Sequence, residues 1–161
     1  MVNHQTDIVI DVENLHKQYP GIRAVDGISF TVQRGEIFGM VGPNGAGKTT
    51  TIECIEGLRQ PDNGRIQVLG LDPCRDGYAL REQIGIQFQA AALPTRIKVL
   101  EALDLFAAFY PHPVDTRHLL DQMGLAEKEK QYLAKLSGGQ RQRIFIALAL
   151  VNNPELVFLM N

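Results

Sequence analysis

One glycine-rich stretch, residues 42–49, limits what this chain can fold into more than any other feature. It reads Gly-Pro-Asn-Gly-Ala-Gly-Lys-Thr, follows the apolar run Ile37–Val41 and precedes Thr50–Leu58, a plausible helix. A strand, a glycine-rich loop and a helix, in that order, are typical of a loop that binds phosphate groups. Taken alone, the stretch has a second interpretation, which is a tight strand-to-helix turn without a ligand.

The residue types of this loop suit a polyphosphate. Gly42, Gly45 and Gly47 let the backbone come close to an anion in conformations that a side chain would forbid. The loop N–H groups and the start of the following helix carry partial positive charge toward that anion. Lys48 adds a full charge near the β and γ phosphates, and the Thr49 hydroxyl is placed to hold Mg²⁺. The residues of this region predicted to bind nucleotide are Gly42, Pro43, Asn44, Gly45, Ala46, Gly47, Lys48, Thr49 and Thr50.

Composition narrows the class of protein. The 161 residues suit one domain, and a net charge of −2 without a dense block of Lys and Arg gives no reason to expect a nucleic-acid partner. Cys54 and Cys74 lack CxxC spacing, and the four histidines lack metal-ligand spacing. The start has no signal-peptide pattern, and the longest apolar run, Ile144–Val151, is too short to cross a membrane, so a soluble chain is expected.

Short strand patterns surround the loop. Strands are predicted at 8–12, 28–32 and 65–69, with a Pro-Gly turn after Tyr19. Tyr19 either caps the edge of the core or presents its ring to a purine base, and the sequence favours neither. A further strand at 84–88 leads to Gln89, which is either a ligand-contacting residue at a strand end or a polar residue leaving the sheet.

The middle of the chain has helical periodicity. One helix is predicted from Val99 to about Phe109, with two prolines after it. A second amphipathic helix contains Leu119 and Leu120, and Gly124 stands just past its end. These segments indicate a helical insertion into an α/β domain.

A second anion-binding helix start is predicted at Ser137. This residue is a good N-cap, and Gly138 and Gly139 expose backbone N–H groups before a helix that is apolar all round from Ile144. A capped helix without a ligand is the alternative. Because the chain also carries the loop at 42–49, a second phosphate-binding element is favoured.

Together these motifs resemble the ATP-binding subunit of an ABC transporter, over about residues 8–159. The P-loop helix, Thr51-Ile-Glu-Cys-Ile-Glu-Gly-Leu58, is most similar to the bacterial multidrug and antibiotic exporter branch. A P-loop kinase or GTPase is disfavoured, because neither explains Ser-Gly-Gly before a buried helix. The resemblance implies an α/β P-loop NTPase fold of ABC type, with an N-terminal antiparallel β part, a partly complete RecA-like parallel sheet and a helical subdomain.

The same resemblance divides the chain into parts of a single incomplete ATP-binding domain, 1–161. The β subdomain takes 1–35 and 60–72, the RecA-like core takes 36–59, 79–89 and 154–161, and the helical subdomain with its signature loop takes 90–153.

The resemblance also implies site residues. Tyr19 matches the aromatic residue that stacks on adenine, and Gln89 matches the Q-loop glutamine that contacts Mg²⁺ and signals to the membrane subunit. The signature loop matches 136–140, so Ser137, Gly138, Gly139 and Gln140 are predicted to bind ATP. The implied cofactors are ATP and Mg²⁺, with Thr49 and Gln89 as metal contacts.

Partners follow from the family as well. Two copies join head to tail, and each ATP lies between the P-loop of one copy and the signature loop of the other. A transmembrane subunit converts ATP binding and hydrolysis into transport. The implied location is therefore cytoplasmic, peripheral to the inner face of the cell membrane.

The last residues depart from the family pattern. After four hydrophobic residues, here Leu156–Leu159, the family has an Asp that holds Mg²⁺ and a Glu that activates water. Met160 and Asn161 stand at those positions, and no histidine follows that could act as the switch residue. A thioether is a poor ligand for a hard cation, and an amide cannot act as a general base. The chain is therefore interpreted as a C-terminally truncated member.

Two hypotheses remain at this point. The first is the ATPase subunit of an ABC exporter, and the second is a non-hydrolytic fragment that at most binds ATP and has no independent transport role. The C-terminal residues favour the second, with weak nucleotide binding, hydrolysis near background and low solubility as its expected properties.

Overall fold

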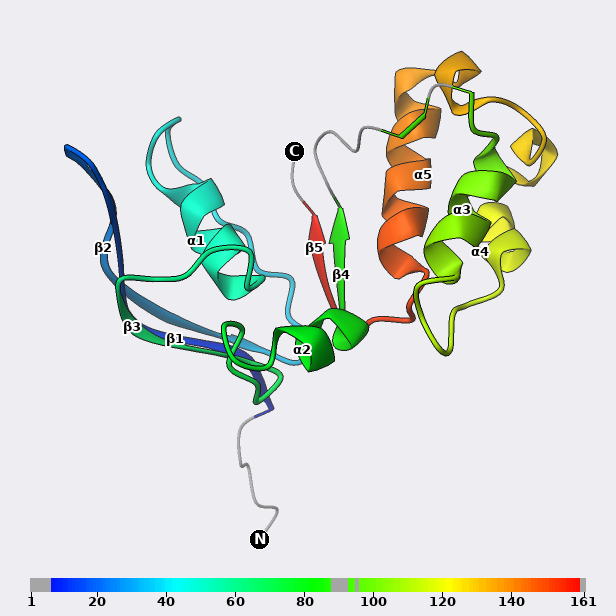
Figure 1. Cartoon of the computed structure of the whole chain (residues 1–161). Coiled ribbons are helices and arrows are strands. Elements are labelled where there is room, and N and C mark those ends of the chain that lie inside the picture. Colours follow the sequence, from blue (N-terminus) through cyan, green and yellow to red (C-terminus); the bar gives the residue numbers. More distant parts are fainter. Residues whose placement is uncertain (1–6, 88–92, 95, 160–161) are drawn as a thin grey trace, which may run out of the picture. The chain divides into compact units, whose positions relative to one another are not determined.

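The computed structural model describes residues 7–87, 93–94 and 96–159 (Figure 1). The chain forms two compact units, Met1–Leu80 and Arg81–Asn161. The first contains an antiparallel sheet and the helix that follows the glycine-rich loop. The second contains a parallel pair of strands and most of the helices.

The antiparallel sheet of the first unit has the strand order β2-β1-β3. Strands β1 (Ile8–Tyr19) and β2 (Ile22–Gln33) form a long hairpin, and β3 (Asn63–Val68) pairs with the other edge of β1. Both hairpin strands are longer than predicted. Irregular register between Val12 and Leu15 interrupts the alternation of apolar and polar residues, and this hides the continuation of β1 in the sequence.

Helix α1 (Lys48–Ile55) packs against β2 and β3. Its Cys54 and Ile55 are buried, as are Val25 of β2 and Val68 of β3. This apolar layer holds the helix that begins at the glycine-rich loop, and it thereby fixes the position of that loop on the sheet.

Residues 37–41, predicted to form the strand before the loop, do not form one, and this prediction is wrong. From Glu36 to Pro43 the backbone has no regular structure, and Ile37 and Val41 are 100% and 96% exposed. Phe38 stacks on Phe30 of β2 with 5.0 Å between ring centroids. A strand requires a hydrogen-bonded neighbour, and no described residue pairs with this run.

The second unit contains the parallel pair β4 (Ile84–Gln87) and β5 (Leu156–Leu159). Helix α2 (Gly77–Gln83), which begins at the end of the first unit, leads into β4. Helix α5 (Gly138–Leu150) precedes β5. At Gly85 the strand lies directly on α5, because a Cβ there would stand 2.0 Å from the Ala149 carbonyl oxygen.

The helical part of the second unit has its own core. It contains α3 (Val99–Ala107), α4 (Thr116–Gln122), the 3-10 turns η1 (Ala126–Lys128) and η2 (Leu133–Lys135), and α5. Residues from all three α-helices are fully buried in it, among them Leu103, Leu120 and Ile144. The two predicted helices are confirmed, and Gly124 follows α4 with φ 65°, a left-handed conformation that ends a helix.

A buried amide joins the end of α2 to the end of α5. The Asn152 Nδ2 donates to the carbonyl oxygens of Arg81, Glu82 and Ile84 at 3.4, 3.2 and 2.9 Å. The last carbonyls of a helix have no intrahelical partner, so this side chain satisfies groups that burial would otherwise leave unpaired.

Candidate functional site

The glycine-rich loop closes over the Lys48 side chain. The Lys48 Nζ donates to the carbonyl oxygens of Gly42 and Pro43 at 2.6 and 2.7 Å, and the Ala46 N–H donates to Pro43 at 3.2 Å. Gly45 and Gly47 both have φ 83°, in the left-handed region that glycine occupies without a steric cost. The loop therefore surrounds a full positive charge at the start of α1.

Gly47 is required for a second reason, which is its contact with the hairpin. A Cβ at this position would lie 2.0 Å from the Ala24 carbonyl oxygen of β2. The Gly47 carbonyl oxygen accepts from both the N–H and the hydroxyl of Thr51, at 2.8 and 2.9 Å. The loop is thus held against the hairpin whose turn follows Tyr19.

The start of α1 suits an anionic phosphate group. Its first turn contains no acidic residue, and the N–H groups of a first helical turn have no partner within the helix. Lys48 supplies the charge, and Thr49 is exposed, so its hydroxyl can reach a metal ion that a polyphosphate carries. The residues present therefore fit a nucleotide phosphate with its Mg²⁺. The other predicted metal contact, Gln89, lies outside the described residues.

Tyr19 is half-buried at the end of β1, and two cations face its ring. The Arg59 Cζ is 5.4 Å and the Lys17 Nζ 5.9 Å from the ring centroid. Arg59 is held by Glu53 at 2.6 Å and Lys17 by Asp62 at 2.7 Å. Sequence analysis missed both cations, because their place beside Tyr19 depends on how the strands and α1 pack. Base stacking by Tyr19 stays a prediction.

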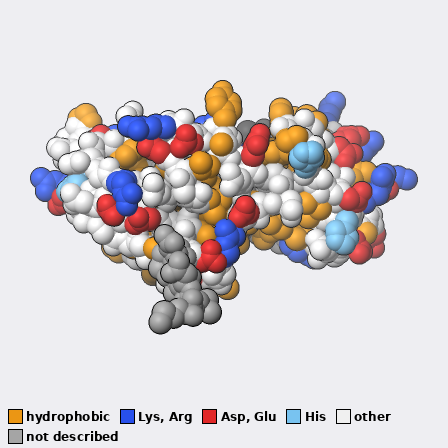
Figure 2. All heavy atoms as spheres, turned by 90° about the horizontal axis from the view of Figure 1, so that it is seen from below, with side chains coloured by type: hydrophobic (Ala, Val, Ile, Leu, Met, Phe, Trp, Pro, Cys, Tyr) orange, Lys and Arg blue, Asp and Glu red, His pale blue; other side chains and the backbone are white. Residues whose placement is uncertain are grey.

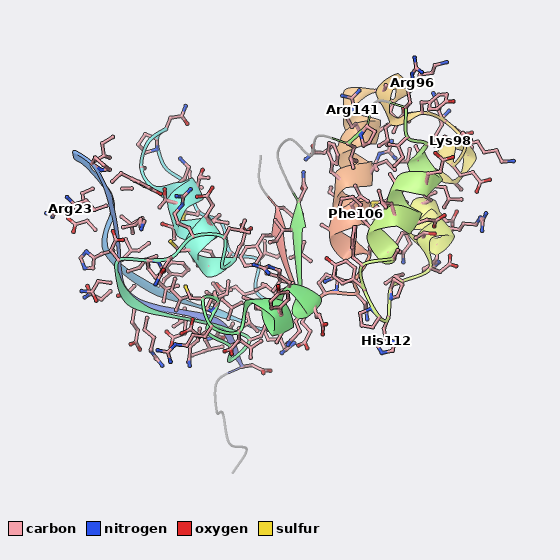
Figure 3. All side chains as sticks on the ribbon, in the orientation of Figure 1. Arg23, Arg96, Lys98, Phe106, His112 and Arg141 are labelled. Atoms are coloured by element: carbon pink, nitrogen blue, oxygen red, sulfur yellow. The ribbon has the colours of Figure 1, made fainter. Side chains whose placement is uncertain are left out.

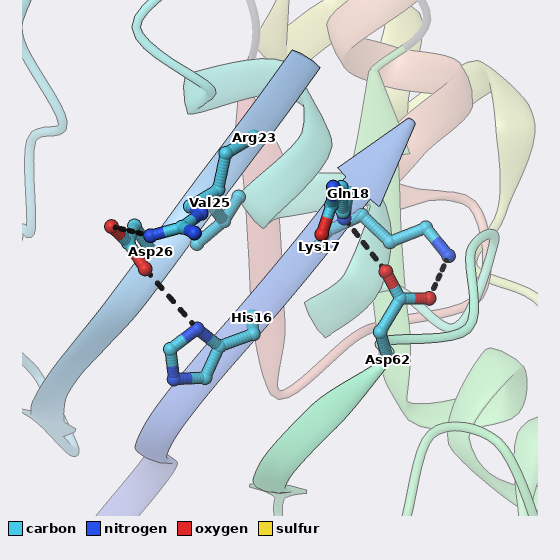
Figure 4. Close-up of a pocket in the computed structure, with 7 residues that line it drawn as sticks. All are labelled: His16, Lys17, Gln18, Arg23, Val25, Asp26 and Asp62. Atoms are coloured by element: carbon cyan, nitrogen blue, oxygen red, sulfur yellow. Dashed lines mark hydrogen bonds and ion pairs between the residues drawn. The ribbon is translucent and has the colours of Figure 1, made fainter. Parts of the chain in front are cut away.

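A polar pocket of about 250 Å³ lies beside this hairpin (Figure 4). Its charges are already paired. Asp62 accepts from Lys17, and Asp26 contacts Arg23 at 3.0 Å and the His16 Nδ1 at 3.4 Å. The Arg23 guanidinium lowers the pKa of Asp26. The charged side chains that line this pocket thus pair with one another and do not require a ligand.

The second predicted anion site begins α5 as a capping box. The Ser137 Oγ accepts from the Gln140 N–H at 3.3 Å, and the Gln140 Oε1 accepts from the Ser137 N–H at 3.0 Å. The N-cap prediction for Ser137 is confirmed. A Cβ at Gly138 or Gly139 would meet nothing within 4 Å, so this helix start is accessible. Arg141 adds a positive charge in the same turn (Figure 3).

The predicted site residues belong to different units. Tyr19 and residues 42–50 lie in the first unit, and residues 137–140 lie in the second. Gln89, Met160 and Asn161 lie outside the described residues. Where the structure describes the chain, it contains no group of three or more His, Cys, Asp or Glu arranged to hold a metal ion.

On the face drawn in Figure 2, Lys and Arg side chains lie among Asp and Glu side chains and do not gather in one basic area. None of the helices in residues 7–87, 93–94 and 96–159 combines the length and the apolar character needed to span a bilayer.

Comparison with known proteins identifies the family. The family model described as ABC transporter matches residues 25–159. The daunorubicin resistance ATP-binding protein DrrA3 of Streptomyces coeruleorubidus is 38% identical over 95% of this chain and 50% of its own length. The methionine import ATP-binding protein MetN of Mesorhizobium japonicum is 39% identical over 92% of this chain and 43% of its own.

A solved structure agrees with these relatives. A dimeric bacterial ABC transporter cassette is 29% identical with a TM-score of 0.77, over 92% of this chain and 72% of that one. The chain spans about half the length of the curated relatives that it matches. These matches confirm the expected α/β P-loop fold with its antiparallel part, parallel sheet and helices, and the chain belongs to the ABC transporter family.

Proposed function

We propose that this chain binds MgATP as the ATP-binding component of an ABC transporter. One observation carries the proposal: the loop at 42–47 closes around the Lys48 ammonium group at the start of α1. A cation, a helix N-terminus and the exposed Thr49 hydroxyl then meet at one place, and together they match a nucleotide polyphosphate and its metal ion.

Each group has a defined task in binding. The Lys48 ammonium exchanges its two loop carbonyl partners for oxygens of the β and γ phosphates. The N–H groups of residues 48–50, in the first turn of α1, would donate to the same phosphates, and the Thr49 hydroxyl would contact Mg²⁺. Tyr19 stacks on adenine, and the Arg59 and Lys17 contacts hold its ring in place.

The second anion site indicates a partner copy. The accessible helix start at Ser137–Gln140 suits the γ phosphate of an ATP bound to the P-loop of another ATP-binding subunit. The dimeric cassette to which this chain is similar supports that arrangement. The remaining proposed partner is a transmembrane subunit, which would place this chain at the cytoplasmic face of the cell membrane.

For the direction of transport we propose export. The support is the P-loop helix, which is similar to those of the multidrug and antibiotic exporter branch, together with the likeness to a daunorubicin resistance protein. The methionine import ATP-binding protein MetN is similar to this chain to the same degree.

Binding, and not efficient hydrolysis, is the activity proposed for the described residues. Strand β5 consists of Leu, Val, Phe and Leu and offers neither a metal ligand nor a general base. Glu155 precedes β5, and its backbone N–H donates to the Gln83 carbonyl oxygen at 2.8 Å. It belongs to the turn that enters the strand.

Equilibrium titration with ATP and Mg²⁺ tests the proposal. Lys48→Ala removes the charge that the loop surrounds and should weaken ATP binding by roughly tenfold or more, as expected for hydrogen bonds to a charged group. Lys130→Ala, at an exposed lysine remote in sequence from the loop, is the matched control and should leave the affinity unchanged. Equal affinity of Lys48→Ala and the wild type, with both variants folded by circular dichroism, would contradict the assignment of the loop.

A further inference from the structure

Glu56, the residue that ends α1, is a buried carboxyl group without a partner. It is 1% exposed, and within the described part of the chain neither carboxyl oxygen has a hydrogen-bond partner. Nucleotide binding as proposed above makes no use of this group. A charged carboxylate in such a place is strongly destabilising, so the site favours the protonated form.

The basic side chains near α1 are engaged elsewhere. Lys17 and Arg59 both act on the neighbouring Cys54 thiol, but Lys17 pairs with Asp62 and Arg59 pairs with Glu53. Neither is positioned to neutralise Glu56. The charge that does act on Glu56 is that of Glu53, which belongs to the same helix and repels it.

Among the described residues, the two strands against which α1 packs direct no unpaired cation at Glu56. Strands β2 and β3 place buried apolar residues, Val25 and Val68, in the layer that α1 covers. Arg65 of β3 forms ion pairs with Asp11 and Glu13. After β3 the chain passes Gly57 at Pro73, where a Cβ on Gly57 would lie 2.5 Å from the Pro73 carbonyl oxygen.

Two acidic groups follow on that segment, and both make local bonds. The Asp72 carboxylate accepts from the Cys74 N–H at 2.8 Å, and the Asp76 carboxylate accepts from the Asp72 N–H at 2.9 Å. Cys74 itself is exposed. Arg75, the cation of this segment, pairs with Asp72 at 3.6 Å. Glu53 is the charged group that acts on Glu56, so proton uptake neutralises the buried carboxylate.

We propose that Glu56 is a proton-binding site coupled through α1 to the nucleotide-binding loop, so that the protonated chain binds nucleotide more tightly than the ionised one. The proposal rests on the proposed ATP-binding function. Helix α1 has eight residues, begins with Lys48 and Thr49, and carries the buried Cys54 and Ile55 in its last turn. Bringing an ionised Glu56 to water displaces that last turn, and the first turn of so short a helix moves with it.

The pH range follows from the environment of the group. Burial raises the pKa of Glu56 from its ordinary 4.5 to about 7, and the Glu53 charge acts in the same direction. Because the folded-state pKa lies above the unfolded value, the contribution to stability is complete below about pH 4.5 and is lost as the pH rises through about 7. The range of pH 5.5–8.5 therefore covers the upper part of this loss and includes the folded-state pKa.

The experiment compares the full chain with Glu56→Gln and with Glu82→Gln, a matched change at an exposed glutamate. Urea unfolding is measured without nucleotide at four pH values from about 5.5 to 8.5, and the affinity for a fluorescent ATP analogue with Mg²⁺ is measured at the same values. The analogue titrates equally in all three proteins, so the difference between them isolates Glu56.

For the wild type and Glu82→Gln, the folding equilibrium constant should fall as the pH rises from 5.5 to 8.5, by at most about 30-fold for a pKa change from 4.5 to about 7. The apparent dissociation constant should rise about fivefold or more beyond any change seen in Glu56→Gln, as typical couplings predict. In Glu56→Gln, the pH dependence that Glu56 adds to the folding equilibrium constant and to the apparent dissociation constant should both be absent. Identical pH profiles in all three proteins would overturn the proposal.

Two further outcomes distinguish a failure of ATP binding from a failure of proton uptake by Glu56. If no protein binds the analogue at any pH, the proposed ATP-binding function fails, and the unfolding series still decides whether Glu56 takes up a proton. If Glu56→Gln does not fold, carbon-13 NMR titration of the Glu56 carboxyl in the wild type replaces it. A midpoint near 4.5 there, or no upward shift on nucleotide binding, would overturn the coupling.

Discussion

The contact between β4 and α5 makes Gly85→Ala the most informative single substitution in the second unit. A Cβ at Gly85 would stand 2.0 Å from the Ala149 carbonyl oxygen and 3.0 Å from the Pro154 Cγ. Both the strand and the helix must then separate, because the obstructing atom is backbone and cannot rotate away. Since Cβ atoms essentially never approach closer than 3.0 Å, the separation is at least 3.0 − 2.0 = 1.0 Å.

The magnitude follows from the cost of overpacking. Inserting a methyl group into a closely packed interior costs typically about 1–3 kcal/mol, and the rigid obstruction places Gly85→Ala in the upper part of that range, at about 2–3 kcal/mol. For a chain of this size, that loss corresponds to a fall in Tm of roughly 4–12 °C. Helix α5 carries the Ser137 helix start, so the substitution should also loosen the proposed signature loop.

Urea unfolding followed by circular dichroism measures the effect. Gly138→Ala is the control, because a Cβ there meets no atom within 4 Å, and its free energy of unfolding should stay within about 0.5 kcal/mol of the wild type. A loss below about 0.5 kcal/mol for Gly85→Ala as well would refute the inferred backbone contact.

Substitutions at two other residues test the bonds of Asn152 and the proposed base stacking of Tyr19. Asn152→Ala and Asn152→Asp both remove the N–H donor shared by the carbonyls of Arg81, Glu82 and Ile84, so each should lower the free energy of unfolding by about 1–3 kcal/mol. A stable Asn152→Asp variant would show that these bonds contribute little. Tyr19→Ala should weaken ATP-analogue binding by about 1–3 kcal/mol, while Tyr19→Phe, which keeps the ring, should bind nearly as the wild type does. Equal losses in both Tyr19 variants would argue against base stacking.

The helical part and the two glycine-rich motifs were predictable because their signals are local. An N-cap at Ser137 and a left-handed glycine at Gly124 determine where a helix begins or ends through contacts within four residues. The positive charge of Lys48 beside three glycines indicates phosphate binding for the same reason. The family resemblance then followed from these motifs, and the comparisons confirmed the ABC transporter family.

Other features depended on groups that are distant in the sequence. The apolar run 37–41 has the composition of a strand, yet a strand exists only where another strand accepts its hydrogen bonds. The Arg59 cation beside Tyr19, the role of Asn152 and the contact at Gly85 arise from segments about 40 to 70 residues apart, which no periodicity reports. The buried Glu56 is the clearest case. From the sequence alone, Glu56 is an ordinary glutamate at a helix end. Only the packing of α1 against the sheet removes its carboxyl group from water and so favours the protonated form.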